Sequence, residues 1–352
     1  MSAQLKVSVT KHYGRKEFNM YPVTQKYIEK KRQAGVFQGV AYHFFDGNEE
    51  EQQIIGYAAI DPQLEKLTKE HVFDVASLTK VICTTSLILR LIEQGKLEVD
   101  RSLKVYLPAF KDERITLRHL LTHTSDIVTW IPHRNQLDQK ALREAYLNLE
   151  AGPELGKKVQ YTDAGTILLG FLIENIYSEE LTTIFKREVL QPLGMNQSAF
   201  PPLLSTIDVV PTEKLADGTI LRGVTHDPKA RVLGPHAGNA GLFTTIDDVA
   251  TFVRMYLNND GQYLNPSTIE MLQEDQTPDK TGQRSLGWDL KGKWLYHTGY
   301  TGMFILMNIA TKQAMIFLSN RVHPNDFRER YILDRDEIIA TYLTEIESKN
   351  VL

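Results

Sequence analysis

The sequence predicts an α/β plus all-α protein, in which one antiparallel sheet is flanked by the terminal helices and interrupted by a large helical insertion. Two observations carry this prediction. Apolar, β-prone runs lie near the two ends of the chain, within 39–58 and 294–318, and the stretch between them shows apolar residues mostly at helical spacing. Pairing both ends in one sheet is the economical arrangement. A site is then expected in the cleft between the sheet and the insertion.

The elements of the sheet domain follow in chain order. A helix is expected over 23–33, after Pro22, and two strands over 39–45 and 52–58 are joined by Asp46-Gly47-Asn48, a hairpin turn signal. The C-terminal end is expected to add three strands and a last helix, over 294–298, 302–309, 315–318 and 334–347. These segments predict a discontinuous α/β domain of residues 1–72 and 283–352.

The insertion, residues 73–282, is predicted to be mainly helical, with the active site at its interface with the sheet domain. Its clearest helix is expected over 80–94, because apolar residues recur at helical spacing and Gly95 is favourable just after a helix end. Further helices are expected over 117–122, 139–149, 164–177, 182–190, 247–257 and 267–273.

The composition of the chain excludes several classes of binding partner and site. Lys and Arg number 40 against 44 Asp and Glu, so the net charge of −4 attracts neither nucleic acid nor an anionic membrane. No stretch approaches the roughly 20 apolar residues of a membrane span, and no signal peptide is recognised, so a cytoplasmic location is expected. A single cysteine, Cys83, excludes an internal disulfide and a cysteine-based metal site. No cofactor or metal is predicted, and the oligomeric state is left open.

Ser77 and Lys80 form the candidate catalytic pair. They lie three residues apart at the start of the helix expected over 80–94, which places both side chains on one face. A serine hydroxyl is a poor nucleophile until a neighbouring group takes its proton, and a lysine can do so only where its surroundings disfavour the ammonium form. The alternative is that Ser77 only caps the helix. A second Ser-x-x-Lys copy, Ser8–Lys11, lacks helical context and is interpreted as chance.

The sequence around this pair resembles the serine β-lactamase superfamily, which includes class C β-lactamases, D,D-peptidases and related esterases. The resemblance begins with FDVASLTK at 73–80 and LRLIEQGKL at 89–97. It continues, in the family's order, through ITLRHLLTHTS (115–125), YTDAG (161–165), LLG (168–170), QPLGM (191–195), GNAGLF (238–243), LGW (286–288) and HTGYTG (297–302). The joint occurrence of these blocks over most of the chain is far more specific than any one of them. The resemblance implies a β-lactamase/transpeptidase-like fold.

The family's second motif is Tyr-x-Asn, whose tyrosine helps to move protons near the nucleophile. The resemblance assigns this role to Tyr161, although the third residue is Asp163, where an asparagine is expected. Because Asp carries charge and cannot donate as Asn does, Asp163 is expected to pair with Lys80 and weaken it as a base, or to contact the substrate. Literal Tyr-x-Asn copies begin at Tyr146, Tyr256 and Tyr263, but none has the right neighbours.

The third motif is Lys-Thr-Gly or His-Thr-Gly on a strand that lines the site. The resemblance places it at His297, Thr298 and Gly299 as substrate-binding residues, and it assigns the oxyanion hole to the backbone N–H groups of Ser77 and Tyr300. His297 is expected to titrate near neutral pH and so to be a weaker anchor for a substrate carboxylate than lysine. A literal Lys-Thr-Gly at 280–282 falls in a polar loop and is interpreted as a decoy.

Two histidines raise the alternative of a zinc site. His119 and His123 have the spacing of helical zinc ligands, but Leu120 replaces the glutamate of the protease signature, so they are interpreted as structural. The string VTHD at 224–227 is expected either to line the cleft or to form a turn.

The expected function is a serine hydrolase that cleaves an ester or amide bond through a Ser77 acyl-enzyme, with Lys80 as base and Tyr161 assisting. Its substrate is expected to be a small ester, peptide or β-lactam. The alternatives are a D,D-carboxypeptidase or β-lactamase, a slowly deacylating penicillin-binding sensor, and an inactive homologue, which the retained Ser77, Lys80 and Tyr161 disfavour.

Overall fold

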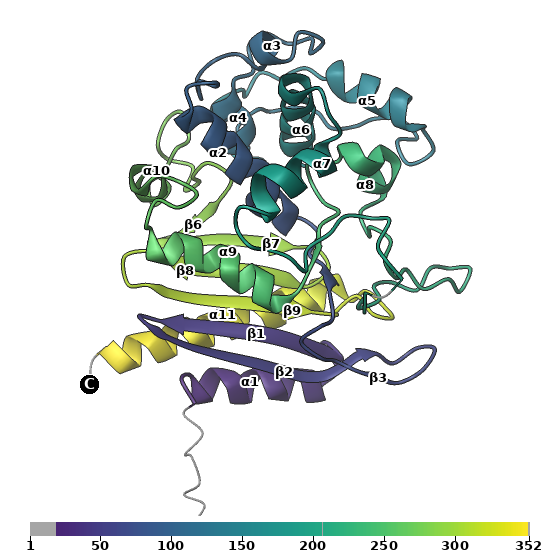
Figure 1. The fold of residues 1–352 in the computed structure, drawn as a ribbon, viewed down its shortest axis with the longest axis vertical. Helices are drawn as coiled ribbons and strands as arrows, with labels where there is room; N and C mark the ends of the chain where they lie inside the picture. Colours follow the sequence, from purple (N-terminus) through teal and green to yellow (C-terminus); the bar gives the residue numbers. More distant parts are fainter. Residues whose placement is uncertain (1–18, 206, 351–352) are drawn as a thin grey trace, which may run out of the picture.

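A seven-stranded antiparallel sheet built from both ends of the chain forms the centre of the fold (Figure 1). The computed structural model describes residues 19–205 and 207–350. The strand order is β3-β2-β1-β9-β8-β7-β6. The bounds are β1 Gly39–Asp46, β2 Glu49–Ala59, β3 Glu65–Lys66, β6 Asp289–Lys291, β7 Trp294–Gly299, β8 Met303–Asn308 and β9 Gln313–Ser319. The pairing of β1 with β9 confirms that the two chain ends share one sheet.

The central strands are buried on both faces, which explains their continuous apolar runs. Val40 and Phe44 of β1 pack with Phe317 of β9 on one side, whereas Ala41 and Ile316 belong to the core on the other side. Because side chains alternate along a strand, each face receives every second residue.

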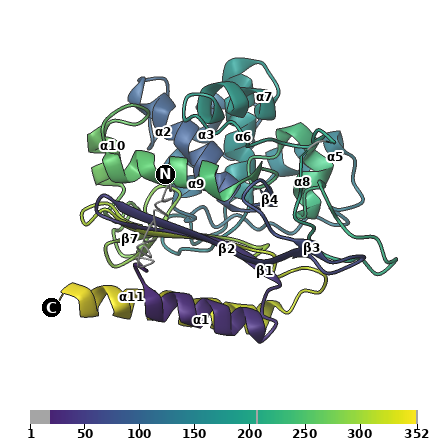
Figure 2. The ribbon, with the colours of Figure 1, turned by 60° about the horizontal axis from the view of Figure 1, so that its bottom comes forward.

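The terminal helices cover one face of the sheet together (Figure 2). These are α1 (Pro22–Gln33) and α11 (Arg328–Asn350). Tyr21, just before α1, packs against Phe44 and against Tyr342 of α11, with ring centroids 5.0 and 4.9 Å apart. The last helix begins at Arg328 and not at 334 as the sequence predicted, because its first turn is rich in charged residues and lacks the apolar spacing that marks a helix.

The insertion lies on the opposite face (Figures 1 and 2). The helix α9 (Ile246–Asn258) packs on β1, β8 and β9. The short strands β4 (Phe73–Asp74) and β5 (Phe243–Thr244) pair with each other within the insertion. The α-helices are α2 Ser86–Glu93, α3 Leu103–Tyr106, α4 Leu117–Leu121, α5 Gln139–Leu147, α6 Ala164–Tyr177, α7 Leu181–Phe185, α8 Pro228–Leu233, α9 Ile246–Asn258 and α10 Pro266–Met271. The division into domains at 72/73 and 282/283 stays a prediction.

Two short π-helical segments, over Lys80–Thr85 and Lys186–Leu190, continue into or from α-helices. The first of them carries Lys80 and continues into α2. Within the described ranges, no helix has the length and apolar character needed to cross a bilayer. The second Ser-x-x-Lys copy, Ser8–Lys11, lies outside the described residues.

Candidate active site

Ser77 lies in a tight turn between β4 and the π-helical segment that carries Lys80. The turn places Ala76 in the left-handed region, with a φ of 46°, which a side chain disfavours. The Asp74 carboxylate stabilises this conformation by accepting the Ala76 N–H at 2.9 Å, and the Thr79 hydroxyl donates to the Ala76 carbonyl at 2.7 Å. Neighbouring side chains therefore hold the backbone conformation that presents Ser77.

Lys80 lies directly behind the Ser77 hydroxyl. Its Nζ is 2.7 Å from Ser77 Oγ and 3.1 Å from the Asn239 carbonyl oxygen, and only 1% of the residue is exposed. The structure thus brings together the two residues that the sequence paired. The same Nζ lies 2.7 Å from Asp163 Oδ1, so Asp163 pairs with Lys80, which is one of the two expectations for this residue.

The charges around Lys80 form a short chain of ion pairs. Asp163 also contacts Lys229 at 3.1 Å, and Lys229 contacts Asp227 at 2.7 Å. Burial alone would lower the pKa of Lys80, but the Asp163 carboxylate and the Tyr161 phenol outweigh it and raise this pKa above its ordinary value. Burial alone would raise the pKa of Asp163, but the ammonium groups of Lys80 and Lys229 hold it well below its ordinary value. Lys80 is therefore an ammonium ion and Asp163 a carboxylate at neutral pH.

Tyr161 borders the same site and is half exposed. Its ring stacks on His123 with centroids 4.6 Å apart, and Lys80 Nζ is 5.4 Å from the ring centroid. Arg284 approaches from a different segment, with its guanidinium carbon 5.8 Å from that centroid. Two cations thus flank this phenol.

The end of β7 forms the opposite wall. A Cβ on Gly299 would lie 2.4 Å from the Val75 carbonyl oxygen, so the strand abuts the turn that carries Ser77. Tyr300 follows, and the Arg321 guanidinium donates from Nε to its carbonyl oxygen at 2.9 Å and also pairs with Asp326. These contacts hold the carbonyl end of Tyr300, the residue whose N–H is the predicted oxyanion donor.

His297 does not reach the surface of the site. Only 3% of it is exposed, its Nδ1 lies 3.0 Å from the Thr298 carbonyl oxygen, and its Nε2 has no hydrogen-bond partner within the described part of the chain. Burial, reinforced by the charges of Lys80 and Arg284, holds the pKa of His297 well below its ordinary value. The expectation that His297 titrates near neutral pH is therefore wrong, because no solvent stabilises its charged form.

One cavity of about 130 Å³ is lined by five of the residues that the sequence assigned to the site, whereas Lys80, Asp163 and His297 do not line it. Its lining combines Ser77, Tyr161, Thr298, Gly299 and Tyr300 with a second set from the end of the chain. That second set is Arg321, Arg328, Tyr331, Ile332 and Arg335. The sequence analysis missed it, because α11 was expected to begin after Arg328 and Tyr331.

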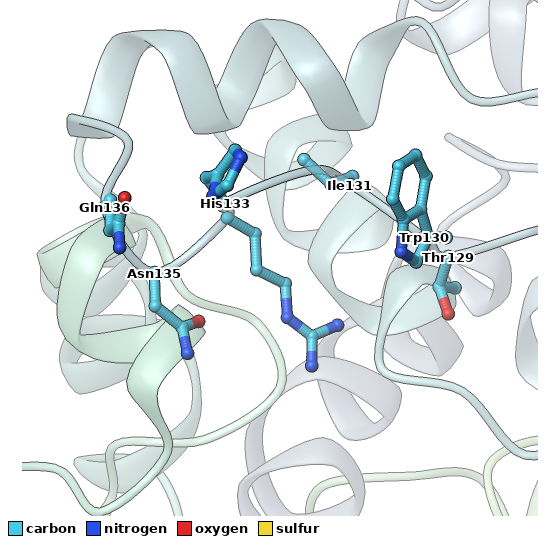
Figure 3. A pocket seen from close by; sticks show the side chains of 7 residues that line it. Thr129, Trp130, Ile131, His133, Asn135 and Gln136 are labelled. Atoms are coloured by element: carbon cyan, nitrogen blue, oxygen red, sulfur yellow. The ribbon is translucent and has the colours of Figure 1, made fainter.

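A larger hollow of about 510 Å³ lies elsewhere, within the segment 129–136 (Figure 3). Thr129, Trp130, Ile131, His133, Asn135 and Gln136 line it together with Arg134. None of these is a candidate nucleophile beside a base, so the smaller cavity at Ser77 is the candidate active site.

The other histidines singled out in the sequence differ in how close they lie to the site. His119 caps the start of α4 by accepting the Thr116 N–H at 3.1 Å, a structural role. His123 accepts the Thr162 N–H at 3.3 Å and stacks on Tyr161, so it also borders the site.

The backbone N–H of His226 donates to the Asp74 carboxylate at 2.7 Å and the His226 ring stacks on Tyr300, so the string 224–227 reaches the site. The described residues contain no cluster of His, Cys, Asp or Glu that could hold a metal ion.

Comparisons with known proteins agree with this geometry. A family model described as Beta-lactamase matches residues 24–338. The chain is 28% identical over 313 residues to a putative D-alanyl-D-alanine carboxypeptidase of Escherichia coli K12, covering 73% of this chain and 71% of that protein. It is also 28% identical over 309 residues to an N-acetylmuramyl-L-alanine amidase of Bacillus subtilis 168, covering 73% and 70%.

Solved structures show the same fold. A class C β-lactamase superposes with a TM-score of 0.75 at 18% identity, covering 94% of this chain and 98% of that one. A penicillin-binding protein homologue from Pyrococcus abyssi superposes with a TM-score of 0.69 at 22% identity, covering 84% and 72%. The fold, and a family match that spans most of the chain, lead to one conclusion. This protein belongs to the β-lactamase family of serine hydrolases.

Proposed function

We propose that this protein hydrolyses an ester or amide bond through an acyl-enzyme formed on Ser77. The observation that carries the proposal is the 2.7 Å contact between Lys80 Nζ and Ser77 Oγ at a cavity that Tyr161 and the end of β7 also line. A nucleophile within hydrogen-bond reach of an activating group is the signature of covalent catalysis.

The assignment of the base changes from the one made on the sequence. Because Asp163 stabilises the Lys80 ammonium ion, we assign Lys80 to supplying positive charge and the Tyr161 oxygen to accepting the Ser77 proton. Ser77 Oγ bonds to the substrate carbonyl carbon while the N–H groups of Ser77 and Tyr300 stabilise the oxyanion. The Tyr161 phenol then protonates the leaving group as the scissile bond breaks. Water attacks the ester, Tyr161 takes its proton, and the acid leaves as that proton returns to Ser77.

The cavity also favours one substrate class. Arg328 and Arg335 line it beside Ser77, and Arg328 is exposed. Guanidinium groups bind carboxylates strongly, so a peptide that ends in a free carboxylate is the second, more specific candidate. The E. coli relative named a putative D-alanyl-D-alanine carboxypeptidase supports this choice.

The test is a fluorophosphonate reaction on the wild type and on Ser77→Ala, read by mass spectrometry of the labelled peptide. We expect stoichiometric labelling at Ser77 and none in the variant. Steady-state assays with a p-nitrophenyl ester, a peptide ending in D-Ala-D-Ala and nitrocefin then distinguish the substrates. A persistent penicilloyl adduct without turnover would support the sensor instead, and a label on another serine would overturn the proposal.

A further inference from the structure

We propose that Asp74 is a positioning residue, which holds the two predicted oxyanion donors, the backbone N–H groups of Ser77 and Tyr300, at the spacing that the reaction needs. This inference rests on the proposed function, because it concerns the oxyanion of that same reaction. Asp74 is the last residue of β4 and does not line the cavity at Ser77. It therefore acts through the groups that it contacts and not by touching the substrate.

The Asp74 side chain joins two walls of the site. Only 1% of the residue is exposed. Its Oδ1 accepts the Ala76 N–H at 2.9 Å, and its Oδ2 accepts the backbone N–H of His226 at 2.7 Å. A carboxyl group is costly to bury without such partners. One side chain thus holds the turn that carries Ser77 and the segment 224–227 together.

The bond to Ala76 directs the first oxyanion donor. Ala76 lies in the left-handed region, with a φ of 46°, which a side chain disfavours. The Ser77 N–H belongs to the peptide that follows Ala76, so the conformation of Ala76 sets the direction in which this donor points. Asp74 stabilises that conformation by accepting the Ala76 N–H.

Two further contacts lead from Asp74 to the second donor. The Asp74 carbonyl oxygen accepts the hydroxyl of Thr301 at 2.6 Å, and Thr301 directly follows Tyr300 in the turn between β7 and β8. The ring of His226, whose backbone Asp74 holds, stacks on Tyr300 with centroids 5.3 Å apart. Both donors must reach one oxygen atom at about 3 Å, so a change in their spacing weakens the stabilisation of the oxyanion.

The experiment compares Asp74→Asn with Asp112→Asn as a matched control. Asp112 is also buried and accepts two backbone N–H groups, from Arg114 at 2.9 Å and from Ala151 at 2.8 Å, but it does not line the cavity at Ser77. An asparagine side chain accepts through one oxygen only, so each variant loses one of its two backbone bonds.

The readout is the labelling of Ser77 by a fluorophosphonate, measured over a range of probe concentrations. A folding defect lowers the final amount of label, whereas a misplaced donor lowers the rate constant at saturating probe. We expect Asp74→Asn to lower that rate constant by about 10- to 100-fold, with little change in the half-saturating concentration, because the oxyanion donors act in the transition state. Asp112→Asn should label at the wild-type rate constant.

Two further comparisons separate positioning from a merely structural role. Ala76→Gly, added to Asp74→Asn, should raise the rate constant by about 5-fold, because glycine adopts the left-handed region without the steric cost. Thr301→Val keeps the shape of the side chain but lacks its hydroxyl, and should lower the rate constant by about 10-fold. Thr301→Ser, which retains the hydroxyl, should restore most of that loss.

Equal rate constants for Asp74→Asn and Asp112→Asn would overturn the inference, as would the absence of any gain from Ala76→Gly. Labelling that survives Ser77→Ala would instead overturn the proposed function, so the two failures are distinguishable.

Discussion

The carboxylate of Asp163 lies between two ammonium groups, 2.7 Å from Lys80 and 3.1 Å from Lys229. In the family pattern an asparagine stands at this position. An asparagine is neutral and does not hold Lys80 in its charged form, so this one residue changes the electrostatic environment of Lys80.

Asp163→Asn should therefore destabilise the protein at neutral pH. Removal of one partner leaves Lys80 buried without its anion, which costs about 3 kcal/mol of unfolding free energy. The pKa of Asp163 is lowered on folding, so its contribution is present above the unfolded value near 4 and is lost as pH falls through the folded value. Urea titrations of variant and wild type should differ at pH 7 and begin to converge as pH falls below about 4.

A matched control for Asp163→Asn is Glu154→Gln, which breaks an exposed ion pair with Lys157 at 3.7 Å. Exposed pairs of this kind contribute about 0.5 kcal/mol. Equal destabilisation by the two variants would show that Asp163 does not stabilise Lys80.

Gly299 is the second residue whose identity the geometry dictates. In Gly299→Ala the new Cβ would lie 2.4 Å from the Val75 carbonyl oxygen, so the end of β7 must move away from the Ser77 turn. A displacement of about 1 Å at a catalytic site costs about 100-fold in rate. We expect that loss in Ser77 labelling by a fluorophosphonate, with an unchanged far-ultraviolet circular dichroism spectrum. Gly292→Ala, which meets only backbone strain at φ +60°, should label at the wild-type rate.

At the scale of elements, the sequence predicts the helices and strands whose apolar residues recur at regular spacing. The helix α6, over Ala164–Tyr177, has the predicted bounds, and the strands at both chain ends lie where apolar, β-prone runs indicated. Periodicity does not reveal the π-helical start at Lys80–Thr85, because every residue of this run is buried and no exposed face marks its pitch. It also misses the first turn of α11, which is rich in charged residues and whose Arg328 lines the cavity at Ser77.

The packing of α11 on α1 and β1 should dominate the stability of the sheet domain. Tyr342 is fully buried between Tyr21 and Phe44, with ring centroids 4.9 and 5.5 Å away. Tyr342→Ala should lower the free energy of unfolding by about 4 kcal/mol, because it leaves a cavity among aromatic rings. Thr344→Ala, two residues along the same helix but exposed, should change it by less than about 0.5 kcal/mol. Urea unfolding followed by circular dichroism checks both values, and similar losses in the two would contradict the argument.

At the scale of the whole molecule, the site forms where the insertion meets the sheet. Ser77, Lys80 and Tyr161 belong to sequence motifs and are predictable from them. Lys229, Arg284 and Arg321 are not, because only tertiary packing brings these cations from distant segments to the candidate site. The acidic residue at position 163, in place of asparagine, predicted pairing with Lys80 but did not predict the contact with Lys229.

The same assembly makes the protein sensitive to acid. Burial holds the pKa of His123 and of His297 well below the ordinary value, so neither takes up a proton in the folded state near pH 6. The unfolded chain does take up those protons below about pH 6.5. Stability must therefore fall as pH falls below that value, by up to about 1.4 kcal/mol per pH unit for each histidine. Burial raises the pKa values of Asp74 and Asp248, so these two carboxyl groups stabilise the folded state as pH falls. Because this opposes the effect of the histidines, the histidine effect is measured by comparing a variant with the wild type.

His123→Asn isolates this effect, because asparagine tolerates the left-handed φ of 56° at that position. The variant loses its stacking on Tyr161 and should be less stable than the wild type at pH 7.5. Its stability should then decline more slowly with acid, by about 1.4 kcal/mol per pH unit between pH 6.5 and 5.5. His133→Asn is the matched control, because His133 has a φ of 52° but is exposed. Urea midpoints that fall in parallel for all three proteins would show that buried neutral histidines do not set the acid sensitivity of this fold.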